Sequence, residues 1–413
     1  MTDRQSKAVL LEDLLHEREL LMLEQEREER RRVQHEAVIK IQMDDVKEDV
    51  RLLNRQLNIL YQELHLSQTQ QMTARKEGFI TTRVSEKQPT VSWEKLFVSK
   101  FGLGGAPFGG VYGNSESPRE IIEAALKNGV NYIDTAYWYG QGKSEKEIGK
   151  AIQSLPRNCY YIATKVGRYE LAADKMFDFR AETVLKTVDE ALTRLRLCCV
   201  DVLQIHDLDF APSPEIILTE TLPALEKAKT AGKCRYIGIT GYQLSKLAEI
   251  LEKSTVQIDT VLTFCRATMQ NNSLLDYLPL FEKHGVGVIN ASPTGLGLLT
   301  PQGPQPWMWA TETISKACQE AVLHAQTNEV SISRLANHYS MNFPGVHTCL
   351  AGVHSLAVLN ENLEASWTDL TEKEQRIHRE IMEKFFAPLE NANWEGVQEE
   401  RYYTELQRLR TVN

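Results

Sequence analysis

Short segments rich in β-branched and aromatic residues alternate with amphipathic segments over residues 96–395, and this alternation constrains the fold more than any other feature of the chain. It is typical of repeated strand–helix units joined in a parallel sheet. Helical periodicity is clear at Ala181–Leu197 and Pro214–Ala231, for example. Eight strands are expected, at Leu96–Leu103, Tyr132–Asp134, Tyr160–Lys165, Val200–His206, Cys234–Thr240, Thr260–Phe264, Val286–Asn290 and Thr348–Gly352. The sequence therefore predicts an α/β fold, a (β/α)8 TIM barrel.

A doubly wound open sheet is the competing fold, and it requires a phosphate-binding loop after its first strand. The segment Gly102-Leu103-Gly104-Gly105-Ala106 stands at that position but lacks the spacing of a dinucleotide-binding fingerprint. A tight turn at the end of a strand explains these glycines better, and the barrel remains the preferred prediction.

The first 66 residues follow a different pattern, rich in Leu, Glu, Arg and Gln and without Gly or Pro. An apolar residue recurs at alternating intervals of four and three, at Ile39, Met43, Val46, Val50, Leu53, Leu57, Leu60 and Leu64. This a/d spacing predicts a coiled coil over residues 1–66, which self-associates or binds a partner helix through residues 39–64. A single solvated helix is the alternative. Residues 67–95 are expected to be a linker, and residues 396–413 a C-terminal tail.

Composition excludes several classes of protein. The net charge of −9 argues against a nucleic-acid-binding surface. The seven cysteines form no C-x-x-C pair and no nucleophile motif, so we expect buried, reduced thiols rather than disulfides, a metal site or a catalytic cysteine. No apolar stretch is long enough to span a bilayer, and the N-terminus lacks the apolar core of a signal peptide. We therefore expect a soluble, cytoplasmic protein without a membrane partner.

Three predicted strands end in a polar side chain that a buried strand does not ordinarily contain: Asp134, Lys165 and His206. Tyr139 follows the first of them after a short loop. In a TIM barrel the carboxyl ends of all strands meet at one rim, so these four side chains are expected to lie together. A buried Lys165 requires a counter-ion, for which Asp134 is suited, and an ammonium beside a phenol stabilises the phenolate.

This group can carry out proton transfer at a carbonyl or hydroxyl oxygen. Tyr139 would pass a proton to the oxygen while His206 donates a hydrogen bond to it. Hydride would reach the carbon at the same time. Because protein side chains cannot supply hydride, the chemistry requires a nicotinamide cofactor.

Several spaced motifs resemble those of the aldo-keto reductase family, and the resemblance extends over Leu96–Trp394. The motifs are Asp134-Thr135-Ala136-x-x-Tyr139-Gly140 with Ser144-Glu145, then Ala163-Thr164-Lys165, and Glu190-Ala191-Leu192-Thr193-Arg194-Leu195 followed by Asp201 and His206. The resemblance implies a catalytic tetrad of Asp134, Tyr139, Lys165 and His206. In that tetrad the tyrosine donates the proton, the lysine and aspartate tune it, and the histidine orients the substrate carbonyl.

Within the family, the chain is most similar to the L-galactose dehydrogenase subgroup. The similarity rests on Gly104–Gly113, Gly238–Tyr242, Ile289–Pro293, Leu298–Pro304 and Asn393-Trp394. Three positions depart from many other relatives and agree with this subgroup: Thr240-Gly241 replaces Ser-Asn, Thr263 replaces Gln, and Ala291 replaces an aromatic residue. The resemblance implies a sugar substrate similar to L-galactose.

The resemblance also implies a nicotinamide cofactor site. Its residues would be Thr240, Thr263, Ser292, Pro293, Gly295, Gly297, Leu298, Gly352, Ser355, Glu361 and Asn362. NADPH-preferring relatives often have Arg or Lys where this chain has Val358, so NAD(H) is favoured over NADP(H). His354 could partly replace that cation, and the alternative is that it is an exposed loop residue.

Several aromatic and charged residues are candidates for the substrate mouth: Tyr112, Trp138, Phe264 and Arg266, together with Trp307 and Trp309. Aromatic side chains can stack on sugar faces, although packing under long loops is an equally good interpretation of each. The leading function is an NAD(P)-dependent oxidoreductase acting on a sugar or related carbonyl. The alternative is a nucleotide-sensing regulatory or scaffold protein that acts through its coiled coil.

Overall fold

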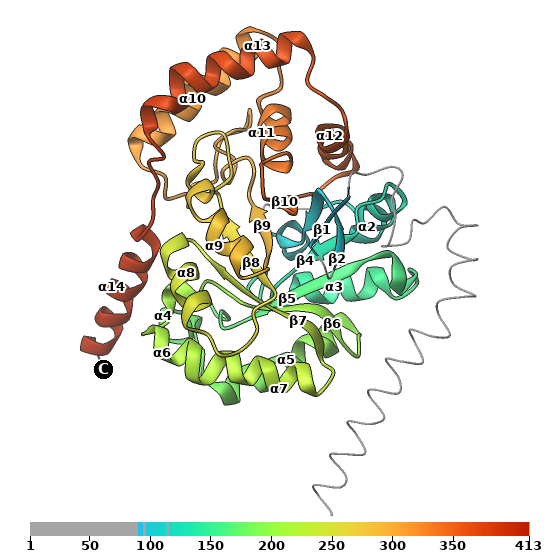
Figure 1. The fold of residues 1–413 in the computed structure, drawn as a ribbon, viewed down its shortest axis with the longest axis vertical. Helices are drawn as coiled ribbons and strands as arrows, with labels where there is room; N and C mark the ends of the chain where they lie inside the picture. Colours follow the sequence, from blue (N-terminus) through green and yellow to red (C-terminus); the bar gives the residue numbers. More distant parts are fainter. Residues whose placement is uncertain (1–89, 94–95, 112, 114, 413) are drawn as a thin grey trace, which may run out of the picture. The chain divides into compact units, whose positions relative to one another are not determined.

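The computed structural model describes residues 90–93, 96–111, 113 and 115–412 (Figure 1). The predicted helical segment 1–66, with its heptad seam at residues 39–64, lies outside the described residues, as do most of the predicted linker and Tyr112.

Eight parallel strands form a closed barrel in the order β10-β3-β4-β5-β6-β7-β8-β9. The strands are β3 (Phe101–Gly104), β4 (Tyr132–Asp134), β5 (Tyr161–Val166), β6 (Val200–Ile205), β7 (Cys234–Gly241), β8 (Thr260–Phe264), β9 (Gly287–Ala291) and β10 (Thr348–Gly352). The predicted TIM barrel is confirmed, and the open sheet is excluded because β10 pairs with both β9 and β3.

An antiparallel hairpin precedes the barrel, formed by β1 (Thr90–Trp93) and β2 (Leu96–Ser99). The prediction of a single strand at Leu96–Leu103 is therefore wrong. The chain bends between β2 and β3, where Ser99 Oγ donates to the carbonyl of Phe101 and Ser99 N–H donates to the side chain of Asn131. Leu96 and Val98 are buried with inward-facing residues of the barrel strands, so the hairpin covers one end of the barrel interior.

Helices connect the strands and form the outer layer. They are α2 (Pro118–Lys127), α3 (Lys143–Ile152), α4 (Ala173–Met176), α5 (Ala181–Leu195), α6 (Pro214–Ile216), α7 (Leu222–Thr230), α8 (Leu244–Lys253), α9 (Leu278–Lys283), α10 (Glu312–Thr327), α11 (Ile332–Met341), α12 (Leu356–Trp367), α13 (Glu372–Ile381) and α14 (Val397–Val412). Short 3-10 turns lie at Ala106–Gly109, Arg157–Cys159, Leu208–Phe210, Ser273–Asp276 and Ala387–Leu389, and π-helical turns at Ile217–Thr221 and Met382–Phe386.

Two segments can be compared with the helices predicted from the sequence. The predicted helix Pro214–Ala231 is a continuous run of α6, a π-helical turn and α7. The predicted C-terminal tail contains a helix, α14, of sixteen residues. Among the described residues, no helix is both long and apolar enough to cross a membrane.

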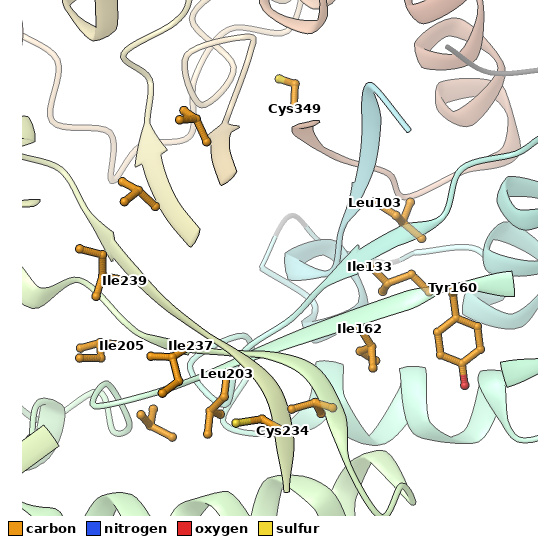
Figure 2. Close-up of a cluster of buried hydrophobic side chains, with 14 of the residues drawn as sticks. Leu103, Ile133, Tyr160, Ile162, Leu203, Ile205, Cys234, Ile237, Ile239 and Cys349 are labelled. Atoms are coloured by element: carbon orange, nitrogen blue, oxygen red, sulfur yellow. The ribbon is translucent and has the colours of Figure 1, made fainter. Parts of the chain in front are cut away.

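The core has two layers, because each barrel strand is buried on both faces. Outward-facing side chains such as Leu103, Ile133, Ile162, Leu203 and Ile237 pack against the helices (Figure 2). A smaller cluster fills the barrel interior. Burial on both faces explains why the strands are continuous apolar runs rather than alternating ones. All seven cysteines are free thiols; six are buried, as the sequence predicts, whereas Cys198 is half-buried.

Candidate active site

A cavity of about 610 Å³ opens at the carboxyl ends of the barrel strands. Every strand contributes a side chain or backbone segment at its end or immediately after it: Gly104, Asp134, Lys165, His206, Thr240, Phe264, Ala291 and Gly352. Such convergence is a general property of the barrel, in which loops at this face carry the chemistry.

The four residues of the predicted tetrad all line this cavity. Lys165 is at their centre, with its side chain only 2% exposed. Its ammonium forms an ion pair with Oδ1 of Asp134, donates to the carbonyl of Thr135 at 3.0 Å, and lies 3.2 Å from the hydroxyl of Tyr139. Three partners for three ammonium protons satisfy a charge that would otherwise be too costly to bury.

The ring of His206 packs edge-on against the ring of Tyr139. The two rings are 5.8 Å apart between centroids and nearly perpendicular, at 87°. Burial lowers the pKa of His206 well below its ordinary value, and the neighbouring Lys165 and Arg168 cations lower it further. His206 is therefore a neutral imidazole near pH 7, and such a ring has one N–H donor to offer.

Asp134 has a second hydrogen-bond partner, which the sequence analysis does not predict. Nε2 of Gln204 donates to Oδ2 of Asp134 at 2.8 Å. Gln204 is fully buried in β6, and the parallel register places it directly opposite Lys165 in β5. The signal in the sequence was an amide inside the apolar run Val202–Ile205, because a buried amide requires hydrogen-bond partners.

Close backbone contact positions Tyr139. A Cβ added to Gly109 would lie 2.4 Å from the carbonyl oxygen of Tyr139, and one added to Gly140 would lie 2.3 Å from the carbonyl oxygen of Gly109. Gly140 also has a φ of +71°, which favours glycine. The turn that carries Tyr139 therefore rests directly on the Ala106–Gly109 turn.

The other motif residues join elements beneath the cavity. The buried carboxylate of Glu145 accepts from Thr164 Oγ1 at 2.5 Å and from Arg194 Nε at 2.6 Å, which ties α3 to β5 and α5. Ser144 Oγ donates to the carbonyl of Gly105 at 2.7 Å. Asp201 accepts from the backbone N–H of Ile162 at 2.8 Å. These residues hold together the strands on which the tetrad lies.

A buried ion pair on the cavity wall, Arg168–Asp207, was not predicted. Both residues line the cavity, and their side chains are each 10% exposed. The guanidinium of Arg168 also lies 4.0 Å from the ring centroid of Trp138, within cation–π distance. Asp207 directly follows His206 in a left-handed conformation, with φ +50°. Neither the spacing nor the composition of the sequence indicated this pair, whose members are 39 residues apart.

Some of the residues predicted to bind the cofactor line the cavity, and others lie away from it. Thr240, Ser292 and Gly352 line the cavity. Thr240 Oγ1 accepts a hydrogen bond from the backbone N–H of Asp207 at 2.9 Å. Thr263 is buried and does not line the cavity, although its neighbours Leu262 and Phe264 do. Since side chains alternate along a strand, Thr263 faces away from the cavity.

The loop from Ser292 to Leu299 is a series of tight turns with positive φ at Ser292, Gly295, Leu296 and Gly297. Within the described part of the chain, the backbone N–H groups of Thr294, Leu296 and Gly297 donate to no protein acceptor. Leu296 and Gly297 are adjacent, and neighbouring free N–H groups of this kind can form an anion-binding concavity. The side chains of Pro293 and Leu298 are buried, so these two residues can contribute only through the backbone. The loop fits the phosphates of a dinucleotide.

The last group of predicted cofactor residues lies at α12 and away from the cavity. Ser355 caps the helix, its Oγ accepting from the backbone N–H of Val358 at 3.2 Å. Asn362 is buried and accepts from Asn337 at 2.7 Å, whereas Glu361 is exposed. The carboxylate of Glu116 accepts from the backbone N–H of Leu356 at 2.9 Å, and thereby occupies the helix N-terminus.

Most of the residues predicted to bind the substrate line the cavity, but one does not. Trp138, Phe264, Trp307 and Trp309 line the cavity. The prediction for Arg266 is wrong. Its side chain is 1% exposed and is bound by the carboxylate of Glu395 at 3.0 Å and the carbonyl of Tyr242 at 3.1 Å. Arg266 therefore holds the C-terminal segment in place instead of lining the mouth.

Comparison with known proteins agrees with this geometry. The sequence profile of the aldo/keto reductase family matches residues 100–383. The chain is 38% identical over 306 residues to L-galactose dehydrogenase of Arabidopsis thaliana, covering 72% of this chain and 94% of that protein. It is 27% identical over 319 residues to D-arabinose 1-dehydrogenase of Saccharomyces cerevisiae, covering 72% and 93%.

A solved structure supports the same assignment. The aldo-keto reductase AKR11C1 from Bacillus halodurans, in its holo form, superposes with a TM-score of 0.58 at 25% sequence identity, covering 71% of this chain and 96% of that one. The family profile, the closed barrel and the grouped tetrad thus agree. The chain belongs to the aldo/keto reductase family of NAD(P)-dependent oxidoreductases.

Proposed function

We propose that the protein is an aldose dehydrogenase that oxidises the anomeric hydroxyl of a free sugar similar to L-galactose, with Tyr139 as its general acid/base. One observation carries this proposal. The hydroxyl of Tyr139 lies 3.2 Å from the ammonium of Lys165, whose charge is held by Asp134. A phenol in that setting can take a proton as a phenolate and return it as an acid.

The chain's own residues supply the proton transfer and the orientation. A bound nicotinamide would accept the hydride from C1 of the sugar. Tyr139 takes the hydroxyl proton, and the Lys165 ammonium stabilises the phenolate while this happens. The neutral imidazole of His206 donates to the same substrate oxygen. Loss of a hydride from C1 and a proton from its hydroxyl converts a cyclic aldose into a lactone.

The walls of the cavity favour a sugar. Trp138, Phe264, Trp307 and Trp309 line the same cavity as the polar side chains of the tetrad. Aromatic faces stack on the C–H faces of sugar rings, and a few polar groups then fix the orientation. The two relatives compared above are named as dehydrogenases of L-galactose and of D-arabinose, which are both aldoses.

Residues at α12 favour NAD(H) over NADP(H). We place the adenosine end of the cofactor at this helix, by resemblance to the family. Glu116 puts a carboxylate on the N-terminal N–H of α12, and no Lys or Arg stands at Val358. The 2′-phosphate that distinguishes NADP(H) from NAD(H) would meet the negative charge of Glu116 there. It would also lack the Lys or Arg side chain that normally binds it.

A substrate and cofactor panel tests this function. L-galactose, D-arabinose, L-fucose and D-glucose would each be assayed with NAD⁺ and with NADP⁺, with reduced cofactor detected by absorbance. We expect turnover of at least one aldose, with NAD⁺ preferred by about tenfold or more in kcat/KM. Glu116→Arg should narrow that preference, whereas Glu120→Arg, the same charge change at an exposed position on α2, should not. The proposed function fails if no aldose is oxidised with either cofactor.

A further inference from the structure

One polar side chain on the wall of the active-site cavity has no part in the chemistry proposed above. Gln141 lines the cavity two residues after Tyr139, in the turn that follows β4. The cations that line the same cavity, Lys165 and Arg168, each have a buried carboxylate partner. Gln141 is instead a neutral amide that is only half-buried, so it can meet a ligand in the cavity.

The backbone of Gln141 lies in the left-handed region, with φ +48°. Gly140 and Gly142 on either side of it also have positive φ, of +71° and +84°. This conformation suits glycine and strains a residue that has a side chain. A strained residue on the wall of a functional site is an observation that points to a role for its side chain.

The orientation of the Gln141 amide follows from its two contacts within the protein. Nε2 lies 3.4 Å from the carbonyl oxygen of Trp138 and 3.5 Å from that of Tyr169. Because both partners are acceptors, the nitrogen faces them and the oxygen forms the other end of the group. Both distances exceed the range of about 2.7–3.2 Å that is usual for such bonds, so the amide is held only weakly.

The amide oxygen of Gln141 is the end that remains for a ligand. Among the residues that the structure describes, Oε1 of Gln141 accepts no hydrogen bond. It is also not one of the side-chain oxygens that burial separates from solvent. An accessible amide oxygen without a donor is suited to accept a hydrogen bond from a hydroxyl group.

The place of Gln141 in the barrel favours the substrate over the cofactor as that ligand. Its amide bridges the loop after β4 to the loop after β5, and Tyr139 belongs to the first of these loops. The loop 292–299, which fits the cofactor phosphates, follows β9 instead. Strands β10 and β3 lie between β9 and β4 in the barrel. The molecule that contacts Tyr139 is therefore the one within reach of Gln141.

We propose that Oε1 of Gln141 accepts a hydrogen bond from a hydroxyl of the bound aldose other than the one that is oxidised. Gln141 thereby distinguishes a polyhydroxylated sugar from a simple cyclic alcohol. This inference rests on the proposed aldose dehydrogenase function and assigns a specificity-determining residue to it. No proton is transferred at Gln141, which binds the sugar while Tyr139 acts at the C1 hydroxyl.

Gln141→Met tests this role, because methionine has a similar volume and no amide oxygen. Oxidation of L-galactose, or of the best aldose in the panel, would be compared with that of tetrahydropyran-2-ol, which has the reacting hydroxyl and no other. We expect KM for the aldose to rise by about three- to tenfold, with kcat and NAD⁺ affinity within about twofold. KM for tetrahydropyran-2-ol should change by less than about twofold. An unchanged KM for the aldose, an equal rise for both substrates, or a parallel loss of kcat and NAD⁺ affinity would each overturn the inference.

Two further variants separate substrate binding from an effect on the turn. Gln141→Gly should raise KM for the aldose in the same way, while its stability in urea is at least that of Gln141→Met, because glycine suits the left-handed backbone. Glu329→Gly relieves a positive φ of +53° at an exposed residue outside the cavity and should leave the kinetics unchanged. A rise in KM for Glu329→Gly equal to that for Gln141→Gly would overturn the inference.

Calorimetry distinguishes failure of this inference from failure of the proposed function. If aldoses are oxidised with the same KM by the wild type and by Gln141→Met, the inference is overturned while the proposed function stands. If no sugar is oxidised, the binding of L-galactose to the full-length protein with NADH would be measured instead. Weaker binding to Gln141→Met would then support the assignment of Gln141 without the proposed function, and equal or absent binding would overturn it.

Discussion

Nε2 of Gln204 donates a hydrogen bond to Oδ2 of Asp134, while the ammonium of Lys165 contacts the other carboxylate oxygen, Oδ1. Asp134 is thus held from two neighbouring strands, and its position fixes that of Lys165. Since Lys165 lies 3.2 Å from the Tyr139 hydroxyl, we expect the position of Tyr139 to depend on an amide that does not touch it.

Gln204→Met should test this dependence, because methionine has a similar volume and no donor. We expect kcat to fall by about tenfold as Asp134 loses a buried hydrogen bond, with the Kd for NAD⁺ unchanged. Steady-state kinetics and cofactor titration measure the two quantities. Gln407→Met at an exposed position is the control. A proportional loss of cofactor binding would mean that Gln204 supports the fold and not the tetrad.

The Arg168–Asp207 pair should show strong energetic coupling. Asp207→Asn keeps a residue type that tolerates the left-handed backbone but leaves a buried guanidinium without a counter-ion. We expect a loss of about 3–5 kcal/mol in the free energy of unfolding, and a smaller loss when Arg168→Met is added. Urea denaturation of the single and double variants measures this coupling. Additive effects would contradict the assigned interaction.

We expect the ionisation of Asp209 to make the free energy of unfolding fall as the pH rises. Burial raises the pKa of Asp209 from 3.8 to about 7, although the backbone N–H groups of Gln243 and Tyr242 oppose the shift. Between these values the folded protein retains a proton that the unfolded chain releases. The contribution of Asp209 to stability is therefore present at low pH and is lost as pH rises towards about 7.

Replacing this carboxyl should remove that dependence. The difference in unfolding free energy between the wild type and Asp209→Asn is expected to change between about pH 5 and about pH 8, with the wild type relatively weaker at the higher pH. Urea unfolding at the two pH values measures it. An identical difference at both would show that Asp209 titrates as an ordinary carboxyl.

Gly109→Ala should displace Tyr139 without touching its side chain. The new Cβ would stand 2.4 Å from the carbonyl oxygen of Tyr139, so one of the two turns must move. A displacement of about 1 Å can lower turnover by about a hundredfold, and we expect a fall in kcat of this order. Cofactor affinity should change little. Wild-type kcat in this variant would show that the backbone contact does not position Tyr139.

Much of the fold was predictable because it is encoded locally. The barrel strands are mostly apolar and mostly buried, and Asp134 and Lys165 stand near the carboxyl ends of two of them. The bend at Ser99 was missed because apolar residues continue on both sides of it. The sequence predicts a tail where α14 lies, because the resemblance ends at Trp394 and the contacts of α14 are with residues distant in sequence.

The parts of the site that were missed depend on such long-range contacts. The sequence places Arg266 at the substrate mouth because an isolated arginine in a loop gives no sign of a partner at Glu395. Arg168 and Asp207 meet only after β5 and β6 are aligned. Gln204 could have been found, because a buried amide next to the strand carrying Lys165 needs a partner, and parallel register places the two side by side.

The central claim is that Tyr139 transfers the proton, and Tyr139→Phe tests it most directly. Tyr137→Phe is the matched control, since it removes a nearby phenol hydroxyl that instead bonds to Glu170 at 2.8 Å. Steady-state oxidation of L-galactose, or of the best aldose in the panel, would be measured beside NAD⁺ affinity. We predict that Tyr139→Phe lowers kcat by about a hundredfold or more with NAD⁺ affinity within about twofold, while Tyr137→Phe retains most activity. Turnover by Tyr139→Phe equal to that of Tyr137→Phe would contradict the assigned role.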